Sequence, residues 1–339
     1  MSHSDQLTSQ LSAILAAVAA ACRVTRHVQA ELERIRQHTK DDRSPVTVAD
    51  YASQAIIAAR LAAFEHPLYL VGEEDAATLR DPASASLREA VAETARVAWP
   101  DATADDVLDA IDRGNHDASG EGYWTLDPID GTKGFLRGGQ YAVSLAYIAR
   151  GEVVFGVLGC PNLSADLERP FDDGDPHGTL YYALRGQGSF VVPADAPDAT
   201  PQAIRASGDD DMRGMRVCES VEAAHSRLDD TARIVAHLGA AGTPARLDSQ
   251  CKYAVVARGQ ADAYLRLPTR PGYVEKIWDH AAGKIVAEEA GALVSDVRGR
   301  ALDFSHGTGL AANRGVVCAA AGFHPRLLAA IAELGLAPK

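Results

Sequence analysis

The stretch from residue 123 to residue 192 limits the possible folds more than any other part of the chain. It contains apolar segments of strand length at 123–126, 142–149, 153–159 and 180–192. Gly151 supplies a tight turn between the second and third segments, and Gly186 and Gly188 divide the last one into a hairpin. Residues 161–178 are polar and contain three prolines, which indicates a surface loop.

Helical patterns precede these strands. Residues 5–38 carry apolar side chains at helical spacing, beginning with Leu7, and predict one amphipathic helix with the core candidates Leu11, Ile14, Leu15 and Val18. Its apolar part lacks the basic start of a signal peptide and continues into the charged residues 23–40. We expect a second helix at 50–64, a short buried strand at 68–71, and partly helical structure over the alanine-rich residues 80–115.

A stretch rich in Ala, Pro, Asp and Ser at 193–212 is the predicted boundary between two halves. We expect an α+β domain over 1–195 with most of the acidic motifs and an α/β domain over 196–339. In the second half, residues 214–220, 263–267 and 292–296 are predicted strands, and residues 228–238, 252–258 and 279–290 are predicted helices.

Charge and composition exclude several classes of partner. The chain has 33 Lys and Arg against 46 Asp and Glu, a net charge of −13, and no basic run, so it would repel nucleic acid and anionic membranes. We find no apolar stretch of the roughly 20 residues that span a bilayer. Five dispersed cysteines without a CxxC pair indicate neither a zinc site nor disulfides. We expect a cytoplasmic monomer with a small-molecule substrate.

The string Asp-Pro-Ile-Asp-Gly-Thr at 127–132 indicates a site for hard cations. Pro128 stiffens the chain and Gly131 lets it bend, so Asp127 and Asp130 are expected on one turn. Mg²⁺ prefers carboxylate, carbonyl and water ligands, and the Ile129 carbonyl lies between the two acids. Gly131 and the following threonine would open a helical turn whose N–H groups face a phosphate.

Three other acidic positions allow two interpretations each. Glu73 and Glu74 follow the strand at 68–71 and are either solvated acids or further metal ligands. Asp279 precedes an apolar helix that Gly291 would end, and aspartate is a favoured N-cap that needs no metal. Asp50 precedes another apolar run and has the same ambiguity.

Four motifs in this order resemble those of the inositol-monophosphatase superfamily: Ser-Pro-Val-Thr-Val-Ala-Asp at 44–50, Gly-Glu-Glu at 72–74, the string at 127–132, and Trp-Asp-His-Ala-Ala-Gly at 278–283. Lys-Gly-Phe at 133–135 and the segments at 220–226, 247–253, 264–268 and 275–283 resemble its 3′(2′),5′-bisphosphate nucleotidase branch. The resemblance implies a layered α-β-α-β-α sandwich. It also implies a lithium-sensitive phosphoric monoester hydrolase that removes the 3′-phosphate of adenosine 3′,5′-bisphosphate, with 3′-phosphoadenosine 5′-phosphosulfate as a further candidate substrate.

Carried over residue by residue, the resemblance implies two or three Mg²⁺ ions and in-line attack of a water. The implied metal ligands are Glu73, Asp127, Ile129 through its carbonyl, Asp130 and Asp279. Asp127 would bridge two ions. Asp50 and Thr132 would orient or deprotonate the attacking water, with Asp50 also beside a third, weaker ion.

The residues that the resemblance places around the nucleotide are Gly131, Thr132, His225, Ser249, Lys252 and Arg266. Lys and Arg neutralise phosphate oxygens, although Lys252 is also interpretable as a solvated helix residue, Arg266 as an ion-pair partner and His225 as a surface residue. An inositol phosphate or fructose 1,6-bisphosphate phosphatase of the same superfamily is the nearest alternative function. A non-catalytic nucleotide- or metal-binding protein is the other, and the intact acidic set argues against it.

Overall fold

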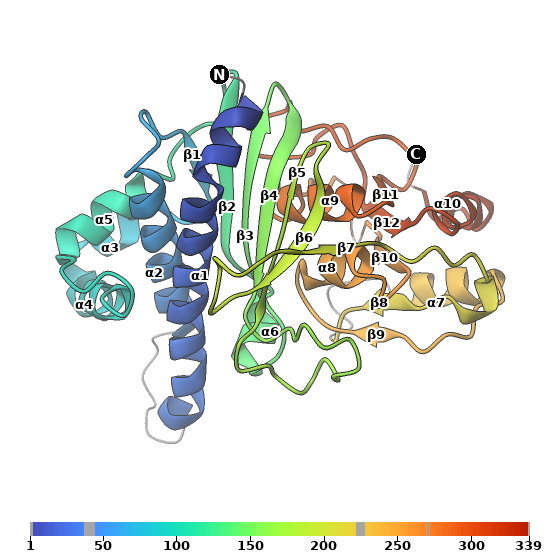
Figure 1. The fold of residues 1–339 in the computed structure, drawn as a ribbon, viewed down its shortest axis with the longest axis horizontal. Helices are drawn as coiled ribbons and strands as arrows, with labels where there is room; N and C mark the ends of the chain where they lie inside the picture. The colour runs from blue at the N-terminus through green and yellow to red at the C-terminus, as the bar shows by residue number, and fades with distance from the viewer. Residues whose placement is uncertain (1–2, 37–44, 222–227, 269, 271, 338–339) are drawn as a thin grey trace.

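The computed structural model describes residues 3–36, 45–221, 228–268, 270 and 272–337, and these fold into alternating layers of helix and sheet (Figure 1). Helices cover both faces of a first sheet, a second sheet lies beyond one of these helical layers, and further helices cover its far face. The expected α-β-α-β-α sandwich is confirmed.

The first layer is helical and begins with the long helix α1. Its members are α1 (His3–Arg36), α2 (Pro45–Leu61), α3 (Ala77–Arg80), the 3-10 turn η1 (Pro82–Ser84), α4 (Ala85–Ala95) and α5 (Ala104–Asp112). By length and hydropathy alone, Asp5–Leu32 of α1 would be able to cross a membrane, so the helix is more apolar than the sequence pattern predicted. Packing explains this, because Ile14, Val18 and Val24 are fully buried in the core shared with α2 and the first sheet.

Helix α2 begins at Pro45, earlier than the predicted start at residue 50. A proline fits the first helical position because the N–H that it lacks has no partner within the helix. Asp50 therefore lies inside the helix, and its interpretation as an N-cap is wrong. The polar residues 37–44 before α2 lie outside the described part of the chain.

The first sheet has seven strands within the described residues, and they follow one another across it in chain order. They are β1 (Leu70–Gly72), β2 (Gly122–Asp130), β3 (Ala142–Ala149), β4 (Glu152–Cys160), β5 (Thr179–Leu184), β6 (Gly188–Pro193) and β7 (Gln202–Ile204). β1 is parallel to β2 and all other neighbours are antiparallel. The predicted turn at Gly151, the hairpin of β5 and β6, and the loop at 161–178 are confirmed. β7 lies beyond the predicted boundary at 195/196 yet joins this sheet; the division into two domains stays a prediction.

Strand β2 runs further than the sequence predicted. It continues through Asp127 to Asp130, and its register against β3 shifts between these two residues. Pro128 lies where the register shifts. The regular hydrogen bonds between the two strands are interrupted there, so a residue without an N–H is tolerated. The prediction of one turn carrying both aspartates is therefore wrong. The bend comes at Gly131, whose φ of +91° suits glycine, and α6 (Thr132–Leu136) follows as expected.

The remaining elements form the other three layers. Helices α8 (Cys251–Ala257) and α9 (Ala281–Glu289) lie between the sheets, and α7 (Leu228–His237) and α10 (His324–Glu333) cover the outer face (Figure 1). Among the described residues the second sheet has the order β11-β12-β10-β8-β9. Its strands are β8 (Val217–Glu219), β9 (Ala245–Arg246), β10 (Ala263–Arg266), β11 (Ala292–Ser295) and β12 (Val316–Ala320), and the 3-10 turn η2 (Met212–Gly214) precedes them.

Close packing fixes α9 against the first sheet. A Cβ atom on Gly156 of β4 would lie 2.8 Å from the Cα of Ala282 in α9, so a larger residue would push helix and strand apart. Ile285 of α9 is fully buried at the same contact. The turn before α9, which carries Asp279, is thereby held in place relative to β2.

Candidate active site

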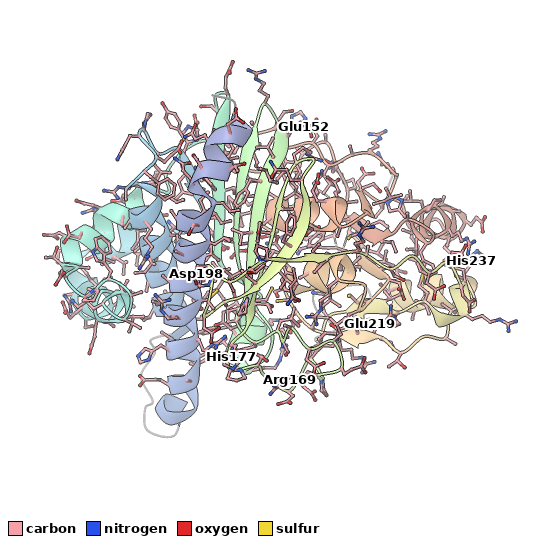
Figure 2. All side chains as sticks on the ribbon, in the orientation of Figure 1. Glu152, Arg169, His177, Asp198, Glu219 and His237 are labelled. Atoms are coloured by element: carbon pink, nitrogen blue, oxygen red, sulfur yellow. The ribbon has the colours of Figure 1, made fainter. Side chains whose placement is uncertain are left out.

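A cavity of about 350 Å³ lies where β2, α6, α8, β10 and the turn before α9 meet. The predicted site residues in its lining are Asp130, Gly131, Thr132, Ser249, Lys252, Arg266 and Asp279. They come from both halves of the chain, so the site depends on how the two sheets pack. Figure 2 shows Arg169 and His177, from the loop at 161–178, at the end of the molecule where Figure 1 shows α6.

Asp127 is the centre of an acidic cluster. Its side chain is only 3% exposed. Burial raises its pKa well above the usual range, and the charges of Glu73, Asp130, Asp279 and Asp50 raise it further. Carboxylates act on one another in this way only when they are close. The structure therefore brings together the acidic residues that the sequence motifs singled out.

The neighbours of Asp127 are shifted in the same direction. Burial, Asp279 and Glu74 raise the pKa of Glu73 to about 7, although part of this side chain reaches solvent and its hydrogen bond to Asp127 acts the other way. Burial and Asp279 raise the pKa of Asp130 to about 6. For Asp50, burial, Glu74 and Glu73 raise the pKa well above its usual value.

Neutral groups of α2 hold the two acidic segments in place. The Gln54 Nε2 group donates to the carbonyl of Glu74 at 2.6 Å, and Gln54 Oε1 accepts from the N–H of Glu74 at 3.1 Å. Ser53 Oγ donates to the Pro128 carbonyl at 3.0 Å. A Cβ on Gly72 would lie 2.5 Å from Gln54 Oε1, so glycine is needed for this approach. One helix thus supplies Asp50 and anchors the segments that carry the other acids.

Sequence reasoning missed Ser53 and Gln54. Both side chains are fully buried in a largely apolar helix. The available signal was the pair of adjacent polar residues within the apolar pattern, because a buried polar side chain requires a hydrogen-bond partner.

Backbone N–H groups orient the carboxylates at the end of β2. The N–H of Ile129 donates to Asp127 Oδ1 at 3.1 Å, and the N–H of Gln250 donates to Asp130 Oδ2. Gly131 packs directly on Ser249, since a Cβ there would lie 2.6 Å from the Ser249 Cβ. The expectation that residues 131 and 132 open a helical turn beside the site is confirmed.

Lys252 is buried beside the acidic cluster, so its interpretation as a solvated helix residue is wrong. Its Nζ donates to the Ser249 carbonyl at 3.3 Å and lies 5.2 Å from the centre of the Tyr264 ring. Burial lowers the pKa of Lys252, while Asp130 opposes that effect. Ser249 has a φ of +68°, a left-handed conformation that is unusual for serine, and it directs its carbonyl to Lys252.

Arg266 combines both of the roles considered for it, because it lines the cavity and forms ion pairs. Its Nη2 lies 2.8 Å from Glu275 Oε2 and 3.3 Å from Asp279 Oδ2. Burial acts to lower the pKa of Arg266, but Tyr264 and these two carboxylates outweigh it, and the pKa is raised. The guanidinium therefore remains charged in the site.

The N-cap interpretation of Asp279 is wrong. Helix α9 begins at Ala281, His280 is its cap residue, and no side chain caps it. Asp279 lies one residue earlier in a turn, which leaves its carboxylate free to face the cavity and Arg266.

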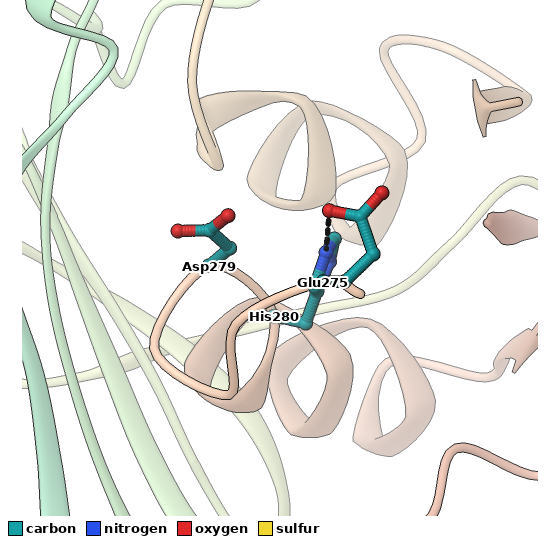
Figure 3. A group of neighbouring side chains, drawn as sticks. All are labelled: Glu275, Asp279 and His280. Atoms are coloured by element: carbon teal, nitrogen blue, oxygen red, sulfur yellow. Dashed lines mark hydrogen bonds and ion pairs between the residues drawn. The ribbon is translucent and has the colours of Figure 1, made fainter. Parts of the chain in front are cut away.

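Glu275, Asp279 and His280 place their oxygen and nitrogen atoms within 4.8 Å of one another (Figure 3). His280 Nε2 lies 3.3 Å from Glu275 Oε2, and its Nδ1 lies 2.8 Å from the Tyr253 hydroxyl. Both ring nitrogens are thus engaged and Arg266 contacts both carboxylates. This group is a hydrogen-bonded support rather than a separate metal site.

Asp248 is a further site residue that sequence reasoning did not single out. It accepts from Arg137, which follows α6, and from the N–H of Val221 at 3.2 Å. These contacts tie the segment after β8 to α6 across the cavity. His225, with the rest of 222–227, lies outside the described residues.

Comparisons with known proteins agree with this geometry. A model described as the inositol monophosphatase family matches residues 6–335. The 3′(2′),5′-bisphosphate nucleotidase of Schizosaccharomyces pombe is 41% identical over 306 residues, covering 87% of this chain and 86% of the relative. The 3′,5′-bisphosphate nucleotidase 2 of Arabidopsis thaliana is 39% identical over 339 residues, covering 96% of each. The solved inositol monophosphatase of Anabaena (Nostoc) sp. PCC 7120 has a TM-score of 0.63 at 20% identity, covers 97% of each chain, and shows the shared fold.

Proposed function

Because the chain belongs to the inositol monophosphatase family, we propose that it is a Mg²⁺-dependent phosphomonoesterase that removes the 3′-phosphate of adenosine 3′,5′-bisphosphate. One observation carries the proposal: a single cavity is lined by two of the clustered acids, Asp130 and Asp279, and by the cationic side chains of Lys252 and Arg266. A substrate with two phosphates needs both, one region for the reacting phosphate and another for the distal one. The names of the relatives with about 40% identity support the same choice.

Enzymes of this family use divalent metal ions, and the donor set fits them. Asp50 and Asp127 are buried without an ion-pair partner among the described residues, and burial raises the pKa of each. Such carboxylates are stable as anions only when a cation is bound nearby. The proposed ligands of two Mg²⁺ ions are Glu73, Asp127, the carbonyl of Ile129, Asp130 and Asp279. Bound Mg²⁺ would supply charge stabilisation for the phosphoryl oxygens and lower the pKa of a coordinated water.

The protein's own groups then position the reactants. We propose that Asp50 and Thr132 orient the attacking water and that a carboxylate oxygen of Asp50 accepts its proton. A third, weaker ion would lie beside Asp50. Attack in line with the departing 3′-oxygen requires no phosphoenzyme.

The distal group of the substrate is assigned to the basic side of the cavity. Lys252 and Arg266 would hold the 5′-phosphate, or the phosphosulfate of 3′-phosphoadenosine 5′-phosphosulfate, with Ser249 and His225 contributing to nucleotide binding. The N–H groups of Gly131 and Thr132 would contact the 3′-phosphate. All five cysteines are free and buried, which is compatible with the proposed cytoplasmic location.

A substrate panel tests the proposal. We expect hydrolysis of adenosine 3′,5′-bisphosphate with Mg²⁺, at a higher kcat/KM than for inositol 1-phosphate or fructose 1,6-bisphosphate, and loss of activity with a chelator. Preference for inositol 1-phosphate would contradict the substrate assignment. Full activity in the chelator would contradict the metal requirement.

A further inference from the structure

We propose that Glu275 is a positioning residue that holds Arg266 toward the substrate cavity and limits its pairing with Asp279. The inference rests on the proposed function, because it takes Asp279 as a metal ligand and Arg266 as a contact for the distal phosphate. Glu275 is buried and does not itself line the cavity.

Arg266 is shared between two carboxylates. The same nitrogen, Nη2, lies 2.8 Å from Glu275 and 3.3 Å from Asp279, so the shorter contact is the one to Glu275. Glu275 is 6% exposed and has no other basic partner than Arg266 and His280 among the described residues. If its charge were removed, Asp279 would be the remaining carboxylate in contact with the guanidinium.

Glu275 is itself held in place by His280, which in turn contacts Tyr253. A neutral imidazole donates from one nitrogen and accepts at the other, so the Nε2–H of His280 donates to Glu275 while its Nδ1 accepts from the Tyr253 hydroxyl. Tyr253 and His280 are fully buried, and a Cβ on Gly283 would collide with the tyrosine ring. The carboxylate of Glu275 therefore has little freedom to follow Arg266.

This arrangement affects two ligands at once. A divalent cation at Asp279 and the guanidinium of Arg266 compete for the same carboxylate oxygens. A phosphate in the cavity also needs the guanidinium, with its remaining donors pointing inward. Glu275 thus favours both the cation and the distal phosphate by occupying Arg266 (Figure 3 shows Glu275 beside His280 and near Asp279).

The test measures Mn²⁺ binding by electron paramagnetic resonance in the full-length protein without substrate. Glu275→Gln should weaken Mn²⁺ binding about tenfold, equivalent to about 1.4 kcal/mol. Arg266→Gln combined with Glu275→Gln should return the Mn²⁺ affinity to within about threefold of wild type, because the competing guanidinium is gone. In both proteins the KM for adenosine 3′,5′-bisphosphate should rise more than that for a small monophosphate.

Two further variants distinguish a specific effect of Glu275 from a general disturbance of the fold. Glu288→Gln also removes a carboxylate paired with basic residues, Arg185 at 3.2 Å and Lys284 at 2.7 Å, but lies at the other end of α9 and should leave Mn²⁺ binding unchanged. Tyr253→Phe removes only the far end of the support and should weaken Mn²⁺ binding by about threefold, a change smaller than one full hydrogen bond usually gives.

Unchanged Mn²⁺ binding in Glu275→Gln would overturn the inference. Weak binding that the second change at Arg266 fails to restore would also overturn it, since Glu275 would then act through the fold alone. A wild-type protein that binds Mn²⁺ but leaves adenosine 3′,5′-bisphosphate intact would contradict the proposed substrate, and the Mn²⁺ series would still decide the role of Glu275.

Discussion

Charged side chains on the two sides of the cavity are held by different kinds of contact. On the acidic side, the segments that carry Glu73 and Asp127 are held by neutral groups, Gln54, Ser53 and backbone N–H groups. On the basic side, Arg266 is paired with carboxylates of the protein itself. The acidic side is therefore incomplete without a cation from solvent, whereas Arg266 on the basic side is already paired before substrate arrives.

The largest effect is expected from Asp127→Asn. The buried carboxylate is a proposed metal ligand at the centre of the acidic cluster, and an amide cannot replace its charge, so kcat should fall more than about 100-fold. The substitution also removes a buried charge, so the metal-free fold should lose no stability. Steady-state kinetics and thermal unfolding measure both effects.

Asp109→Asn is the matched control for this change. Asp109 is exposed on α5 and pairs with Arg80 at 2.9 Å, away from the cavity. Its substitution should leave kcat unchanged. Near-normal activity of Asp127→Asn in saturating Mg²⁺ would contradict the assignment of Asp127 as a metal ligand.

A smaller effect is expected from Gln54→Met, which keeps the length of the side chain and removes its hydrogen bonds. Glu74 would lose partners for both its N–H and its carbonyl, at a cost of about 1–3 kcal/mol in the free energy of unfolding. Substitution of residues that hold metal ligands in place typically lowers metal affinity by about 10–100-fold. Urea unfolding and Mg²⁺ titration of activity are the measurements.

Gln187, exposed in the turn between β5 and β6, provides the comparison. Gln187→Met should change neither quantity. If Gln54→Met kept the wild-type Mg²⁺ dependence, the hydrogen bonds between Gln54 and the backbone of Glu74 would have no part in placing Glu73.

On the basic side, Lys252→Met should lower kcat/KM for adenosine 3′,5′-bisphosphate by about tenfold, since a charge-assisted contact to the distal phosphate is lost. Hydrolysis of a small monophosphate should change little. Burial lowers the pKa of Lys252, so removing the amine should not destabilise the fold. Equal losses for both substrates would place Lys252 at the reacting phosphate instead.

Part of the fold and part of the site could be predicted from the sequence. The motifs at 72–74 and 127–132 indicated which acids would gather because they resemble the motifs of one family, whereas the local pattern alone left the role of Glu73 and Glu74 open. The tight turns around Gly151 and Gly186 predicted the pairing of β3 with β4 and of β5 with β6. The roles of Gln54 and Glu275 depend on contacts between segments far apart in the chain, and no local pattern records those.

Other differences have local physical causes. The extension of β2 through Pro128 depends on a shift in register against β3, which is a property of the pair of strands. β12 and α10 were not predicted, and β12 is buried along its whole length, so it lacks the alternation that marks a half-exposed strand.

The pH dependence of stabilisation by Mg²⁺ tests most directly whether the acidic side is incomplete without a cation. The pKa values of Asp130, about 6, and Glu73, about 7, are raised above those of the unfolded chain. Raised carboxyl pKa values mean that the metal-free fold loses stability as pH rises from about 4 to about 7. Bound Mg²⁺ should remove that penalty, so we predict that it raises Tm by several degrees near pH 8, much less near pH 5, and hardly at all in Asp127→Asn. An equal shift at both pH values, or an undiminished shift in Asp127→Asn, would contradict the account.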